Sequence, residues 1–266
     1  MPWTQWRARF EARRHRERPA IGDIGEIPPS LRPALATSLA RFQLGETGEG
    51  RIVADLRRKA TAWNLSPDYL EALRLFIAEE GRHASILGEA VRALGGRTQT
   101  RTWSADGFAR VRRLGGPGFE LLVLLAAEVA ALSFYGLLAE RLPAGPLREA
   151  IREIAADEVI HLRFHVEFLR THLPARTTRR AVTAAWSPLG MSAGAVIAAD
   201  HGATLGALGS SRREVLARAH ELVGDTMQAI FDAPMSTGRT RIAFTSFCGP
   251  MPACGEGPRA SASASG

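Results

Sequence analysis

Two pairs of side chains constrain the fold of this chain more than any other feature. Glu80 stands three residues before His83, and Glu158 stands three residues before His161. On an α-helix this spacing places both members of a pair on one face, one turn apart. Carboxylate oxygens and imidazole nitrogens are suitable ligands for iron or manganese. One such pair is a weak signal, so the interpretation depends on where the two pairs lie.

Both pairs lie on helix faces that should be buried. Apolar residues recur in phase with each pair, and the predicted helices extend well beyond it on both sides (Leu73, Phe76, Leu87 and Val91; Ile151, Ile154 and Phe168). A buried charge is strongly disfavoured unless it is paired or bound to a metal. The alternative to a metal site is a pair of core polar networks whose hydrogen bonds are satisfied internally.

The chain pattern predicts two helical hairpins joined by a long crossover. The first hairpin begins near Ser30 and Pro33, turns at 62–65, and ends at Gly95 and Gly96. The second consists of helices at 119–141 and 146–174, with a short helix possible in the 97–118 connection. Glu46 and Glu49 fall on the apolar stripe of the first helix, and Glu128 lies near the centre of the third.

The hairpin geometry brings carboxylates from all four helices to one level. In an antiparallel hairpin, residues at equal depth are equidistant from the turn. The midpoint between Glu128 and Glu158 is Pro143, and the midpoint between Glu46 and Glu80 is residue 63, inside the other predicted turn. This agreement predicts a dinuclear metal centre between the hairpins.

Composition indicates a single core with extensions. The 266 residues are 45% hydrophobic and carry a net charge of +7. The 33 arginines and one lysine are spread along the chain, which indicates a GC-rich bacterial genome rather than a nucleic-acid-binding surface. Cys248 and Cys254 are interpreted as incidental thiols, with a redox pair as the alternative.

Nothing in the sequence requires a membrane. The apolar run from Leu121 to Leu138 carries Glu128 near its centre, so we interpret it as the most buried helix of a bundle. The N-terminal region lacks the apolar core of a secretory signal, so we expect a cytoplasmic protein.

The expected organisation has four parts. Residues 1–30 form a basic arm, for which a solvated tail is favoured over docking on the bundle. Residues 31–174 form the four-helix bundle, and 175–235 form an extension with two helices, near 190–208 and 212–232. Residues 236–266 form a flexible tail.

Over about residues 33–172 the sequence resembles the ferritin-like di-iron carboxylate superfamily. The string Gly45-Glu46-Thr47-Gly48 looks like the first-helix motif of rubrerythrins and ubiquinone-pathway hydroxylases. The strings that end in His83 and His161 look like the acid-Glu-x-x-His motifs of acyl-carrier desaturases and multicomponent di-iron monooxygenases. The resemblance implies an all-α fold: a ferritin-like four-helix bundle with two additional C-terminal helices.

The resemblance also implies a ligand set and its supports. Four carboxylates and two histidines would hold two metal ions, whose four positive charges they neutralise (Glu46, Glu80, His83, Glu128, Glu158 and His161). Glu79 and Asp157 would each accept a hydrogen bond from the ligand histidine of the other motif.

Three residues depart from this pattern or leave alternatives open. Glu49 lies one turn after Glu46 and could replace it as a ligand or add to it. His165 could be a third histidine ligand or an acid–base group, although a hydrogen-bonded core histidine is favoured. Tyr135 could support the metal ligands from behind or carry a radical, although an ordinary buried tyrosine with a bonded hydroxyl is favoured.

The favoured function is a non-haem di-iron oxidase or oxygenase. It would use O₂ and an external electron donor to oxidise a small organic substrate, and it could be a homodimer. Two iron ions are expected, with manganese or a manganese–iron pair as alternatives. The alternative functions are iron storage with ferroxidase chemistry, and peroxide detoxification of the rubrerythrin or manganese-catalase type. A bundle without metal also remains open.

Overall fold

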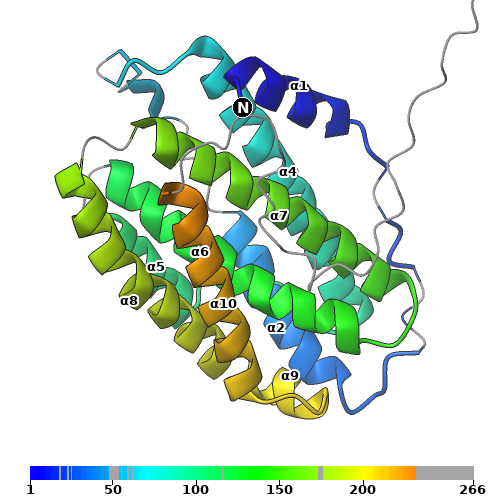
Figure 1. Ribbon diagram of the computed structural model, residues 1–266. Helices are drawn as coiled ribbons and strands as arrows, with labels where there is room; N and C mark the ends of the chain where they lie inside the picture. The colour runs from blue at the N-terminus through cyan, green and yellow to red at the C-terminus, as the bar shows by residue number, and fades with distance from the viewer. Residues whose placement is uncertain are drawn as a thin grey trace, which may run out of the picture.

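The structure is a computed structural model that describes residues 1–17, 19–22, 24, 26–47, 54, 56–58, 60–61, 63–114, 117–172 and 176–231. Throughout these residues the regular elements are helices, so the predicted all-helical class is confirmed there (Figure 1). They are α1 (Trp3–Arg13), α2 (Arg32–Glu46), α4 (Pro67–Ala93), α5 (Trp103–Arg112), α6 (Pro117–Arg141), α7 (Pro146–His172), α8 (Arg176–Asp200), α9 (Gly202–Ala207) and α10 (Arg212–Phe231).

Two helical hairpins form the centre of the molecule. α2 packs against α4, α6 packs against α7, and α4 contacts α7 across the hairpins. Aromatic rings join the other two helices, because Phe42 of α2 lies 4.7 Å from the Tyr135 ring and 5.3 Å from the Phe134 ring of α6. The four helices therefore enclose a common core. α5 lies in the crossover between the hairpins, as predicted.

Local sequence signals set the ends of α4. The Ser66 hydroxyl accepts a hydrogen bond of 3.1 Å from the Tyr69 backbone N–H, which caps the helix where Pro67 begins it. After α4, Gly95 adopts a φ of +79°, a conformation that costs glycine little. A Cβ on Gly96 would lie 2.7 Å from the Cβ of Ala36, so the absence of a side chain lets α2 approach this end of α4.

The start of α2 differs slightly from the prediction. The helix begins at Arg32, and the residue before it, Leu31, makes no side-chain capping bond, so Ser30 is not the cap. Pro33 lies in the first turn as predicted, where its missing N–H costs little. The predicted path from this helix to the turn at 62–65 crosses residues 48–53, 55, 59 and 62, which lie outside the described residues.

Two helices are long and apolar enough to cross a membrane by composition alone. They are Gly118–Arg141 within α6, with 89% of its most apolar window buried, and Ala181–Asp200 within α8, with 28% buried. The burial of α6 is that expected of a core helix. Glu128, on this helix, is only 8% exposed.

The C-terminal helices differ from the predicted pair. α8 begins at Arg176 rather than near 190 and continues through Pro188 to Asp200, and the short α9 precedes α10. α8 and α10 pack on each other and on α6, and in Figure 1 they lie on the opposite side of the hairpins from α1. The indole N–H of Trp186 donates to the Val223 carbonyl at 2.9 Å, which joins α8 to α10.

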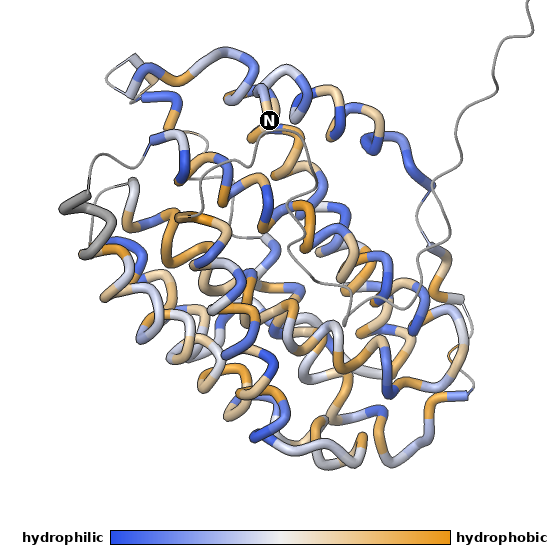
Figure 2. The backbone as a smooth tube through the Cα atoms, viewed as in Figure 1, coloured by the Kyte–Doolittle hydropathy of each residue, from blue (hydrophilic) through white to orange (hydrophobic). Residues whose placement is uncertain are grey.

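The basic N-terminal arm is not a solvated tail. Residues Trp3–Arg13 form α1, which packs against α4 and buries Trp6 and Phe10 to 3% and 2% exposure. Figure 2 shows hydrophilic residues gathered at the C-terminal end of this helix and in the segment that follows. The prediction of a solvated tail was wrong, because burial of the aromatic residues between the arginines docks this segment on the bundle.

Candidate metal centre

Four buried side chains from α4 and α7 meet at the centre of the two hairpins. Glu80 and His83 come from α4, and Glu158 and His161 come from α7; each of the four is at most 1% exposed. One donor atom from each lies within 4.8 Å of the others, a spacing that would allow shared metal ligation. Both predicted Glu-x-x-His pairs therefore face the same point.

Both imidazoles direct Nδ1 toward the carboxylates of this cluster. His161 Nδ1 lies 2.6 Å from Glu80 Oε1 and 3.3 Å from Glu158 Oε2. His83 Nδ1 lies 3.1 Å from Glu158 Oε1. Nδ1 is therefore the nitrogen that each histidine offers to the centre.

The other ring nitrogens make crossed contacts between the two motifs. His161 Nε2 donates to Glu79 Oε2 at 2.9 Å, and His83 Nε2 donates to Asp157 Oδ2 at 3.3 Å. Each histidine is thus held by the acidic residue that precedes the glutamate of the opposite motif, the contact expected from the resemblance. A carboxylate in this position fixes the ring orientation and raises the basicity of the inward nitrogen.

A layer of arginines surrounds these outer carboxylates. Arg13, Arg16 and Arg82 all donate to Asp157, with Arg16 at 3.0 Å and Arg82 at 2.5 Å. Arg82 also lies 2.7 Å from Glu153. Three guanidiniums therefore balance Glu79, Glu153 and Asp157, which leaves the charge of the inner carboxylates uncompensated by this layer.

Glu46 and Glu128 complete the inner group from the remaining two helices. Glu46 hydrogen-bonds with Glu80, and Glu128 hydrogen-bonds with Glu158. The Tyr135 hydroxyl donates to Glu46 Oε1 at 2.9 Å. Carboxylates from all four core helices thus lie at one level.

In the metal-free chain, bound protons offset the negative charge of the inner carboxylates. Burial and the neighbouring Glu158 raise the pKa of both Glu46 and Glu128. Although burial alone would raise it, contact with His161 holds the pKa of Glu158 well below its usual range. Burial opposes protonation of His161, but Glu158 and Glu79 outweigh it and raise its pKa to about 10.

The donor set of this cluster could hold metal, because it gathers two carboxylates and two imidazoles in a buried group. In the part of the chain that the structure describes, His83 Nδ1 and Glu158 Oε1 lie 3.1 Å apart but do not form a regular hydrogen bond. Four carboxylates and two neutral imidazoles would balance two divalent ions and remove the need for the extra protons. A buried group of this kind is otherwise costly, because each unpaired polar atom loses its hydration.

The other predicted site residues have different outcomes. His165 is 1% exposed, and among the described residues neither of its ring nitrogens has a hydrogen-bond partner. Burial lowers its pKa to about 3. Glu49 lies outside the described residues, as do Cys248, Cys254 and the predicted tail. His201 is buried, and its ring stacks on that of Phe42 with the centroids 4.7 Å apart.

Sequence reasoning missed the arginines around the centre. Arg82 lies inside one of the motifs, but no role was assigned to it. Arg13 lies seven residues after Trp6 and three after Phe10, a spacing that places it on their face of a helix. That periodicity could have predicted a docked amphipathic helix, although it could not have identified the surface beneath it.

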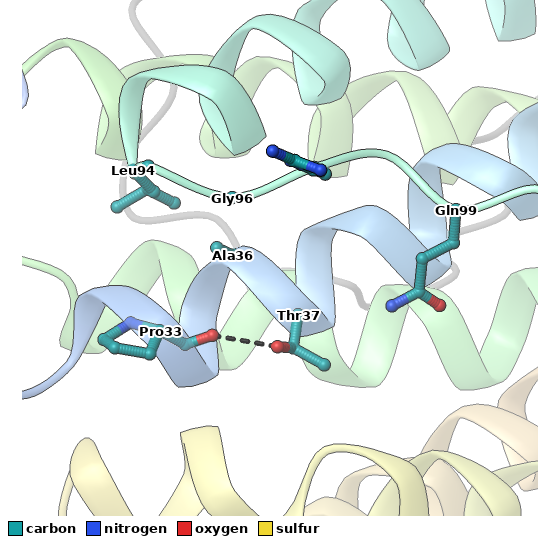
Figure 3. Close-up of a pocket in the computed structure, with 8 residues that line it drawn as sticks. Pro33, Ala36, Thr37, Leu94, Gly96 and Gln99 are labelled. Atoms are coloured by element: carbon teal, nitrogen blue, oxygen red, sulfur yellow. Dashed lines mark hydrogen bonds between the residues drawn. The ribbon is translucent and has the colours of Figure 1, made fainter.

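A cavity of about 260 Å³ lies away from the carboxylate cluster, where the start of α2 meets the end of α4. Figure 3 shows Pro33, Ala36, Leu94, Gly96 and Gln99 around it, with the Thr37 hydroxyl donating to the Pro33 carbonyl at 2.9 Å. Glu46 lies at the opposite end of α2, so this cavity is separate from the carboxylate cluster.

Comparison with known proteins found no matching family model, no matching curated protein and no matching solved structure. The fold and the site are therefore the basis for assigning a class of protein. They define a helical protein with a buried carboxylate and histidine cluster that could bind metal.

Proposed function

We propose that this chain is a ferritin-like dinuclear metalloenzyme, and specifically a non-haem di-iron oxidase or oxygenase. The observation that carries the proposal is the crossed pair of motifs. Each histidine offers Nδ1 to a shared group of glutamates while an acidic residue of the other motif holds its Nε2. A core polar network without metal does not require that both Nδ1 atoms face the same glutamates.

Six residues would hold the two metals: Glu46, Glu80, His83, Glu128, Glu158 and His161. When bound, a pair of Fe(II) ions would supply electrons to O₂, and the activated oxygen would oxidise the organic substrate. The chain itself fixes the ligands and excludes water. Phe76 contributes to this exclusion, because its ring lies edge-on to His161 at 4.8 Å and to His165 at 4.9 Å.

Loading the centre would exchange protons for metal ions. Glu46 and Glu128 have raised pKa values and His161 is held protonated, so all three would release protons as the cations bind. Glu79 keeps its charge throughout, because contacts with His161 and Arg13 outweigh burial and lower its pKa to about 2. A charged acceptor behind His161 is therefore present in both states.

The proposal also covers the substrate class, the source of electrons and the location of the protein. The substrate is a small organic molecule, the electrons come from an external donor, and the protein is cytoplasmic. Sequence resemblance to desaturases and monooxygenases favours iron and O₂ over storage or peroxide removal. Each of those alternatives predicts a different outcome of the following experiment.

The test is anaerobic loading with Fe(II) followed by exposure to O₂. The proposal predicts stoichiometric O₂ uptake with a transient visible absorption band, and loss of both in Glu80→Ala. Glu71→Ala is the matched control, because Glu71 lies on the same helix but pairs with Arg74 at the surface. Growth of a large iron mineral would support storage, and peroxide turnover with manganese would support catalase chemistry. A folded chain that binds no iron would contradict the proposal.

A further inference from the structure

The contacts of α1 connect the N-terminus to the proposed metal centre. We infer that Arg13 is a positioning residue that locks Glu79 and Asp157 together, and through them orients both histidines of the centre. This inference rests on the proposed function only in assigning His83 and His161 as metal ligands. It gives the N-terminal helix a role in metal binding.

Arg13 bonds to both outer carboxylates at once. Its Nε donates to Glu79 Oε1 at 2.9 Å, and one of its terminal nitrogens donates to Asp157 Oδ1. The second oxygen of Glu79 accepts from His161, and the second oxygen of Asp157 accepts from His83. Each carboxylate thus bridges the same guanidinium to a different histidine.

Other cations do not duplicate this arrangement in the part of the chain that the structure describes. Arg16 and Arg82 contact Asp157 and Glu153, but neither contacts Glu79. Arg13 is also more enclosed than Arg16, with side-chain exposures of 15% and 42%. Its guanidinium therefore links the two halves of the crossed arrangement.

The shape of the guanidinium explains how one residue can do this. Its donors form a rigid planar fork that holds two acceptors in a fixed relation, whereas the lysine ammonium is a flexible point charge. Without the fork, Glu79 and Asp157 would be free to rotate away from the histidines. That rotation would loosen the hold on Nε2 of both histidines and therefore change the direction of Nδ1.

The aromatic residues of α1 bring Arg13 to this position. Trp6 and Phe10 are buried on the same face of the helix, and the Phe10 ring lies 6.2 Å from the His161 ring. These contacts anchor α1 independently of Arg13. Removing the guanidinium should therefore leave the helix docked.

The test compares Arg13→Gln, Arg13→Lys and Arg7→Gln in titrations with Co(II), a probe with visible absorption. Loss of a residue that orients metal ligands typically weakens binding 10–100-fold, so we expect at least about tenfold for Arg13→Gln and a smaller loss for Arg13→Lys. Arg7 is the control, because it lies on the same helix and pairs with Asp68 at the surface, with 52% exposure. Wild-type affinity in Arg13→Gln would overturn the inference.

A double-variant background separates positioning from general stability. In a chain carrying Glu79→Gln and Asp157→Asn, adding Arg13→Gln should weaken Co(II) binding no further, because the groups it holds are already altered. An additional tenfold loss in that background would show that Arg13 acts by another route. Circular dichroism of each variant verifies that the helices remain formed.

The inference can also be judged if the wild-type chain binds no metal, a result that would end the proposed function. In the metal-free chain, NMR can follow exchange of the Nε2 protons of His83 and His161. We expect both to exchange at least tenfold faster in Arg13→Gln than in Arg7→Gln. Equal exchange rates would overturn the positioning role of Arg13.

Discussion

At the residue scale, each histidine of the centre has a carboxylate oxygen within 3.3 Å of each ring nitrogen. His161 illustrates this, since Glu79 holds Nε2 at 2.9 Å while Glu80 lies 2.6 Å from Nδ1. One side of the ring meets a permanent charge and the other meets the inner carboxylates. The surrounding protein therefore favours the tautomer that would bind a metal through Nδ1.

The outer carboxylates should control metal affinity without being ligands. We predict that Glu79→Gln and Asp157→Asn each weaken Fe(II) binding by about 10–100-fold, because a neutral amide holds the imidazole N–H less strongly. Anaerobic titration measures this effect. Glu71→Gln is the surface control on α4. Unchanged affinity in both variants would contradict the role assigned to the crossed contacts.

The stability of the metal-free chain should depend on pH with a definite sign. His161 has a folded pKa of about 10 against an ordinary value of 6.5, so its contribution is complete below pH 6.5. That contribution is lost as the pH rises toward 10. Glu46 and Glu128, whose pKa values are also raised, act in the same direction.

We therefore predict that the melting temperature of the metal-free chain falls between pH 6.5 and 10. Thermal unfolding at a series of pH values measures this, and His161→Gln should make the decline shallower. Glu79 has the opposite sign, because its contribution is present above pH 4.5 and lost as the pH falls toward its pKa of about 2. A melting temperature that rises steadily to pH 10 would be inconsistent with a protonated His161.

At the element scale, α8 and α10 approach closely where α8 carries glycine. A Cβ on Gly194 would lie 2.9 Å from the Cβ of Ala219, and a Cβ on Gly190 would overlap Val223. These two glycines, one turn apart, form the contact face of α8. The packing of this helix pair depends on the absence of side chains there.

We predict that Gly190→Ala destabilises the chain by about 1–3 kcal/mol, because the added methyl forces α8 and α10 apart. Gly224→Ala is the matched control on α10. A Cβ there meets no atom within 4 Å, so alanine should stabilise the helix by about 0.5–1 kcal/mol. Chemical denaturation measures both. Since the glycine face lies between α8 and α10, and neither helix contributes a side chain to the cluster, Gly190→Ala should retain its metal content.

Sequence signals predicted the core elements better than the peripheral ones. Ser66 and Pro67 begin α4, and Gly95 ends it, because caps and stops are local chemistry. The docking of α1 depends on a distant surface that no local pattern specifies. The early start of α8, at Arg176, lies in a polar stretch whose sequence carries little apolar periodicity.

At the scale of the whole molecule, the site is the point where four helices contribute acidic residues at the same depth. Spacing along the sequence was enough to predict the cluster of Glu80, His83, Glu158 and His161. It could not predict Arg13, whose partners lie 66 and 144 residues away along the chain. Long-range contacts of this kind depend on tertiary structure.

Metal binding should stabilise the whole molecule, because the ligands meet only in the folded chain. At a free Fe(II) concentration 100 times the dissociation constant, one site adds about 2.7 kcal/mol to the free energy of unfolding. Thermal unfolding under anaerobic conditions should therefore shift upward with Fe(II) and return after treatment with a chelator. Glu158→Ala should show no shift, and an equal shift in that variant would place the bound metal elsewhere.

The most direct test of the central claim is the number of metal ions bound per chain. Elemental analysis after anaerobic Fe(II) loading and removal of free metal should give two iron ions for the wild-type protein. Glu158→Ala should lose this pair, while Glu71→Ala should keep it. A folded wild-type chain that retains no metal, or a Glu158→Ala chain that retains two ions, would contradict the assignment of this cluster as a dinuclear centre.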